Sequence, residues 1–137
     1  MITYATKLMT GITLISVPTI AFGGYFLLTI LSGKQEALAL TDFQKAMFRA
    51  GHAHAGVIVL LSLICQILVD FSALSEPWRW TVRVAIVLAA LMISGGFFAA
   101  AGGAGRTTPS NLIYLLYAGV FFLTYSVITL GVGLIRG

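Results

Sequence analysis

The chain has 137 residues, of which 59% are hydrophobic and only 9% are charged, and its formal net charge is +4. Soluble domains carry roughly 25% charged residues, so a chain this short cannot bury that much apolar surface in a water-soluble core. A disordered protein, a nucleic-acid binder and a disulfide-built secreted domain are excluded, because the cations are scattered and the chain has a single cysteine. The composition predicts a small integral membrane protein.

Four apolar segments divide the chain, and each is long enough to cross a bilayer. A transmembrane helix needs about 20 apolar residues, and lipid cannot satisfy unpaired backbone groups, so each segment must be helical. The sequence predicts an all-α fold, an integral membrane bundle of four transmembrane helices at about residues 8–32, 42–70, 77–101 and 109–135. They form one domain over residues 1–137. The first segment is too long for the apolar part of a signal peptide, so we interpret it as a transmembrane helix.

The predicted helix ends carry recognisable capping chemistry. Thr41 and Gln44 fit a capping box, in which Thr41 caps the second helix and Gln44 reaches back to the cap. Pro77 and Pro109 predict the first turns of the third and fourth helices, where proline is tolerated. Pro18 lies inside the first helix and predicts a kink there.

Charge says little about orientation in the membrane. Four spans place both termini on the side of the turn around residues 71–80, and the Lys and Arg residues divide equally between the two sides. The positive-inside rule therefore does not choose, and only the free amino group favours cytoplasmic termini. We expect a multi-pass protein of the bacterial cell membrane, with the lipid bilayer as its partner. Small residues recur every seven positions at Gly119, Ser126 and Gly133, a close-packing seam that is compatible with a homo-oligomer or a larger membrane complex.

The two histidines, His52 and His54, are the sharpest feature of the chain. Residues two apart on a helix point about 200° from each other, so these two cannot chelate one ion from a regular helix. His52 shares a stripe with Gln66 and Asp70, and a polar stripe on a membrane helix should face the bundle or a water-filled cavity. We therefore predict that His52 points inward and is the candidate metal ligand. His54 is expected to meet another helix, another subunit or the headgroup region.

Polar residues at the predicted start of the fourth helix lie on the same membrane side as the histidines. Asn111 and Tyr114 open that helix, Arg106 precedes it in a glycine-rich loop, and Arg49 lies one turn before His52. These side chains could converge on one site near the surface. The alternative is an interfacial aromatic belt and a histidine that only hydrogen-bonds across helices. The candidate cofactor-binding residues are His52, His54, Tyr114, Asn111 and Arg49.

Two further residues have simpler expected roles. Asp70, near the opposite surface, is expected to pair with Arg79 or Arg83 in a structural contact. Cys65 is expected to be a small buried hydrophobe.

The stretch FRAGHAHAGVIVLLSL, residues 48–63, resembles a segment of small bacterial four-helix membrane proteins, and the layout of the whole chain is similar to theirs. More remotely, His52-Ala53-His54 at the opening of a second helix resembles small proteins that are similar to subunit I of haem-copper oxidases. Histidine in that setting is associated with haem ligation, so the resemblance implies haem binding by His52 or His54. A complete oxidase core is excluded, because the chain has no other histidine.

Three classes of function remain open. The first is a histidine-centred site near one membrane surface that binds haem or a metal ion in redox chemistry, with Met92, water or another subunit completing the coordination. The second is a non-catalytic accessory or scaffold subunit, in which the histidine only ties helices together. The third is an enzyme or transporter for a small lipophilic molecule on the Tyr114 side, and no nucleophile-base pair is visible to support it.

Overall fold

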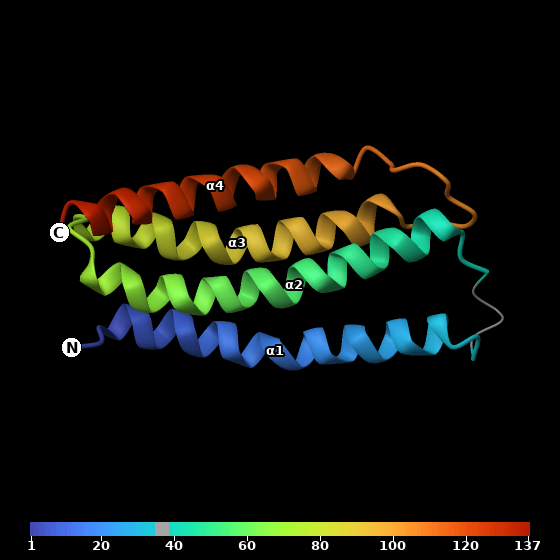
Figure 1. The fold of residues 1–137 in the computed structure, drawn as a ribbon, viewed down its shortest axis with the longest axis horizontal. Helices are drawn as coiled ribbons and strands as arrows, with labels where there is room; N and C mark the ends of the chain where they lie inside the picture. Colours follow the sequence, from blue (N-terminus) through green and yellow to red (C-terminus); the bar gives the residue numbers. More distant parts are fainter. Residues whose placement is uncertain (35–38) are drawn as a thin grey trace.

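The computed structural model describes residues 1–34 and 39–137, and it consists of four long helices that run alternately up and down (Figure 1). Among the described residues, these four are the helices long and apolar enough to cross a membrane. The predicted all-α class is confirmed, and the chain is a multi-pass membrane protein. The helices are α1 (Tyr4–Leu31), α2 (Asp42–Leu68), α3 (Glu76–Ala100) and α4 (Ile113–Ile135), with a short 3₁₀ turn η1 (Val69–Phe71) after α2.

The predicted start of α2 is confirmed in atomic detail. The side chain of Thr41 accepts a hydrogen bond from the backbone N–H of Gln44, and the side chain of Gln44 accepts one from the backbone N–H of Thr41. Pro77 lies in the first turn of α3, as predicted. Both starts follow from local sequence: at α2 the cap satisfies N–H groups that have no partner within the helix, and at α3 proline fits the first turn, where no N–H donor is needed.

The start of α4 differs from the prediction, because the helix begins at Ile113 and not at Pro109. A tertiary hydrogen bond decides this, since Ser110 N donates to Ala100 O over 2.9 Å and ties the loop back to the end of α3. The chain then turns at Ser110, whose carbonyl accepts from Ile113 N. Residues 101–112 therefore form a loop over the end of the bundle.

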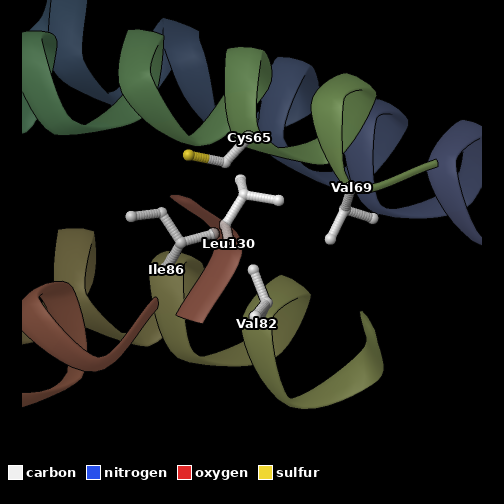
Figure 2. Packing of buried hydrophobic residues seen from close by; sticks show 5 residues of the cluster. All are labelled: Cys65, Val69, Val82, Ile86 and Leu130. Carbon is white, nitrogen blue, oxygen red and sulfur yellow. The ribbon is translucent and has the colours of Figure 1, made fainter. Parts of the chain in front are cut away.

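The apolar core lies where α2, α3 and α4 meet. Cys65, Val69, Val82, Ile86 and Leu130 form one buried cluster there (Figure 2). Cys65 is a buried hydrophobe, as predicted. α1 lies along α2, and α4 lies along α3 (Figure 1).

Glycines bring α3 and α4 into close contact. A Cβ atom on Gly96 would lie 2.6 Å from Leu116 N, and one on Gly119 would lie 2.8 Å from Ile93 N. Gly133 faces Leu74 in the same way, and the Ser126 hydroxyl donates to Val82 O. The small-residue seam of Gly119, Ser126 and Gly133 is thus packed inside the chain.

A polar cluster, buried except at Thr3, holds α1 to α2 and α3 at the end where both termini lie; we call it the polar clamp. Arg83 is 1% exposed, its Nη2 lies 2.6 Å from Asp70 Oδ1, and its Nη1 donates to Gln66 O over 2.9 Å. Asp70 also accepts hydrogen bonds from the Thr3 and Thr6 hydroxyls over 2.9 and 2.7 Å, and from Thr3 N over 3.0 Å. These hydrogen bonds offset part of the free-energy cost of removing the carboxylate from water. The polar clamp comprises Thr3, Thr6, Gln66, Asp70 and Arg83.

The polar clamp confirms the expected pairing of Asp70 and selects its partner. Arg83 forms the pair, whereas Arg79 donates to the main-chain carbonyls of Leu74 and Ser72. The choice follows from burial, because Arg83 lies on the α3 face that packs against α2.

We expect Gly96→Ala to lower the free energy of unfolding by about 1–3 kcal/mol, because its Cβ meets the main chain of Leu116. Gly95→Ala is the matched control, since its Cβ would meet nothing within 4 Å, and it should be neutral or stabilising by up to about 1 kcal/mol. Reversible unfolding in mixed micelles, followed by circular dichroism, measures both. Equal stability of the two variants would contradict the close approach of α3 and α4.

Asp70→Asn should destabilise the protein by about 3–5 kcal/mol, because it leaves the buried Arg83 cation without its charged partner. The control is Asp42→Asn, which removes an exposed pair with Lys45 at 3.7 Å and should change stability little. The same unfolding measurement applies. A loss at position 70 no larger than at position 42 would show that the polar clamp does not hold the bundle together.

Candidate ligand site at His52

His52 lines a cavity of about 270 Å³ between α1, α2 and α3. The side chain is half-buried, as the stripe of polar residues on α2 predicted. The other polar side chains that line the cavity are Ser16 and Thr19 from α1 and Ser94 from α3. Apolar side chains, among them Ile20 and Leu91, form most of the remaining wall.

The imidazole of His52 packs directly against the main chain of α1. A Cβ atom on Gly24 would lie 3.1 Å from Cε1 and 3.2 Å from Nε2 of the ring, and one on Gly23 would lie 3.6 Å from Nδ1. Two adjacent glycines therefore leave the space that the ring occupies. Helices approach closely where small residues meet, and here the close approach admits an aromatic ring.

The three hydroxyl groups that line the cavity already donate their hydrogens to main-chain carbonyl groups. Ser16 donates to Thr13 O over 2.7 Å, Thr19 donates to Ser16 O over 2.6 Å, and Ser94 donates to Gly51 O over 2.8 Å. Each therefore offers only lone pairs to an occupant. Neither ring nitrogen of His52 makes a hydrogen bond to a described residue. These three hydroxyls make the cavity rich in acceptors.

His54 lies on a different face of α2, as the helical spacing predicted. Its side chain is exposed, its Nδ1 donates to Ala50 O over 2.8 Å, and its ring centroid lies 5.0 Å from that of Phe97. It does not line the His52 cavity. The two histidines therefore do not form one site within a protomer.

The structure does not bring the other candidate residues to His52. Arg49 is exposed, and Tyr114 is 69% exposed with its ring 5.9 Å from that of Tyr117. Asn111 lines a separate surface pocket beside Arg106. For Tyr114 and Asn111 the reason is the spatial order of the helices, because α4 lies on the far side of α3 while the cavity opens between α1, α2 and α3 (Figure 1). Arg49 is on α2 itself but does not line the cavity.

Sequence reasoning missed the hydroxyls of α1 and α3. A usable signal was present, because Thr13, Ser16, Thr19 and Gly23 recur at three- and four-residue spacing and so share one face of α1. Sequence reasoning predicted Gln44 as part of the capping box but missed its tertiary contacts, since the buried amide donates to Ala101 O over 2.9 Å and to Gly103 O over 2.7 Å. That amide docks the glycine-rich loop onto the start of α2.

The described residues around His52 supply a single candidate ligand for a metal ion or haem. No group of three or more His, Cys, Asp or Glu side chains comes together within residues 1–34 and 39–137. Met92, the sequence candidate for a second haem ligand, has its Cβ beside Gly119 of α4 and does not line the cavity. Asp70 is held in the polar clamp at the other end of α2. Within one protomer, the described residues offer His52 alone.

We expect Gly24→Val to displace the His52 ring and to lower the free energy of unfolding by about 1–3 kcal/mol, because the new side chain occupies the space of the imidazole. Gly11→Val is the control, since a Cβ there meets nothing within 4 Å. The ¹⁵N and ¹³C resonances of the His52 ring should shift in the first variant and stay in place in the second. Unchanged ring resonances in Gly24→Val would contradict the contact between His52 and α1.

Comparison with protein-family models, curated proteins and solved structures finds no match to this chain. The resemblance of the histidine motif to small bacterial four-helix proteins and to oxidase-like subunits therefore stays a prediction.

Proposed function

We propose that the protein binds a small lipophilic molecule within the membrane, and that His52 is the residue that contacts it. The observation that carries the proposal is an imidazole that lines a cavity while neither of its nitrogens bonds to a described residue. Ionisable side chains inside membranes are costly, and a polar group that is left unpaired there costs still more. A partner from outside the chain removes that cost.

The cavity limits the size and the chemistry of the ligand. Its volume of about 270 Å³ lies just below the range of roughly 300–1,000 Å³ that is typical of ligand pockets, so the occupant is small. The walls are mostly apolar, which favours a lipophilic molecule. The hydroxyls of Ser16, Thr19 and Ser94 offer acceptors only, so the ligand should carry an O–H donor. A phenol, a quinol or a lipophilic alcohol meets these conditions.

Two other functions draw less support from this geometry. Haem binding needs space for a macrocycle, and no second axial ligand lies beside His52 in the described part of the protomer. A scaffold function for His52 is supported by the packing of its ring against Gly24, but no hydrogen bond from the ring to another helix is found among the described residues. Cytoplasmic termini and homo-oligomer formation stay predictions from the sequence.

The test compares 4-hexylphenol with hexylbenzene, which has the same apolar part but lacks the hydroxyl. We expect the phenol to bind the protein in nanodiscs about tenfold more tightly, because one hydrogen bond contributes about 1.4 kcal/mol. His52→Phe should abolish the difference, whereas His54→Phe, the matched control outside the cavity, should retain it. The affinities are measured by NMR or calorimetry on the protein in nanodiscs, with the two probes in competition.

Equal affinities of the two probes for the unmodified protein would refute the proposal, as would a loss of discrimination in both histidine variants. An absorption spectrum of the purified protein provides a separate check. A Soret band that disappears in His52→Phe would establish haem binding in place of the function proposed here.

A further inference from the structure

Ser62 is a fully buried residue whose hydroxyl has no hydrogen-bond partner among the described residues. It lies on α2 and lines a second cavity, of about 110 Å³, between the same three helices as the His52 cavity. Most buried polar groups in proteins are paired, and an unpaired hydroxyl is expected to have a partner that is not part of the chain. Ser62 therefore combines two independent observations, an unpaired hydroxyl and a place in the wall of a cavity.

The polar groups of this second cavity complement an O–H group. Thr13 Oγ1 donates to Met9 O over 2.8 Å, and Ser16 Oγ donates to Thr13 O over 2.7 Å, so both present lone pairs only. Ser62 has an unused hydrogen as well as lone pairs. An occupant with a hydroxyl can therefore accept a hydrogen bond from Ser62 and donate one to Thr13 or Ser16. The rest of the lining, Ile12 and Val87 among it, is apolar.

The two cavities adjoin each other along α1. Ser16, Val59, Ala90 and Leu91 line both of them. Ser62 lies ten residues after His52, which corresponds to about 15 Å along the axis of α2. A molecule bound at His52 can therefore extend toward Ser62 between the same helices.

We propose that the cavity at Ser62 is a hydroxyl-binding subsite, filled either by water or by the distal hydroxyl of a ligand that extends from His52. A water molecule takes up about 30 Å³ in the liquid, so the cavity has room for about three of them. The ligand as a source of the hydroxyl rests on the function proposed above. The assignment of water as the source does not rest on that function, because water needs only the cavity and the unpaired hydroxyl of Ser62.

The first experiment detects water in the protein without added ligand. Water-edited solid-state NMR in bilayers measures how fast magnetisation passes from water to the methyl groups of Val59 and Ala90. If water fills the subsite, transfer is efficient in the unmodified protein and slows at least threefold in Ser62→Ala. Ser126→Ala is the matched control, because Ser126 is equally buried but donates to Val82 O and should leave the rates unchanged.

The second experiment detects a ligand hydroxyl by comparing 1,10-decanediol with 1-decanol. If the subsite binds the distal hydroxyl, the diol binds about tenfold more tightly, and Ser62→Ala removes that advantage while it preserves the affinity for 1-decanol. Fast water transfer or tighter diol binding, lost in Ser62→Ala, supports the subsite. Slow water transfer together with equal affinities overturns it. Failure of 1-decanol to bind at all counts against the function proposed for His52, and the water measurement then decides the subsite alone.

Discussion

The ion pair between Arg83 and Asp70 is the interaction on which the rest of the structure depends. Lipid tails are as apolar as leucine, so apolar helices gain little from leaving lipid for each other, and polar contacts and close packing must hold them together. α1 needs this most, because only 11% of its most apolar window is buried, against 44% for α3. Asp70 binds Thr3, which caps α1, and Thr6 within α1, while it pairs with Arg83 of α3. The polar clamp therefore keeps α1 in the bundle.

Both cavities exist because α1 is held in this position. α1 supplies one wall of each cavity, and its glycines at positions 23 and 24 accept the ring of His52. The polar clamp lies near the termini and His52 lies toward the other end of α2, so the two ends of α1 are fixed by different means. Charge and hydrogen bonds fix the first end, and the fit of an imidazole against glycine fixes the second. The weaker packing between these two contacts coincides with the space that we assign to a ligand.

The acceptor character of the site has a simple helical origin. In a membrane helix, serine and threonine satisfy their hydroxyl hydrogens by bonding to carbonyl groups one turn earlier. Thr13, Ser16 and Thr19 all do so, which leaves lone pairs facing the cavities. Ser62 is the exception on α2, because its hydroxyl finds no such partner among the described residues. A ligand hydroxyl can donate to the acceptor oxygens of α1 in either cavity, and at Ser62 it can also accept a hydrogen bond.

The sequence by itself determined the properties that depend on composition and on neighbours along the chain. The length of the apolar segments and the absence of water in lipid determined that the chain is a membrane protein built of helices. Local capping determined the start of α2. Helical spacing placed His52 and His54 on different faces. Tertiary structure alone decided which helices meet. It moved the start of α4 through the bond from Ser110 to Ala100, and it kept Tyr114 away from His52. These outcomes depend on contacts between separate elements of the chain, which the pattern within any one helix does not encode.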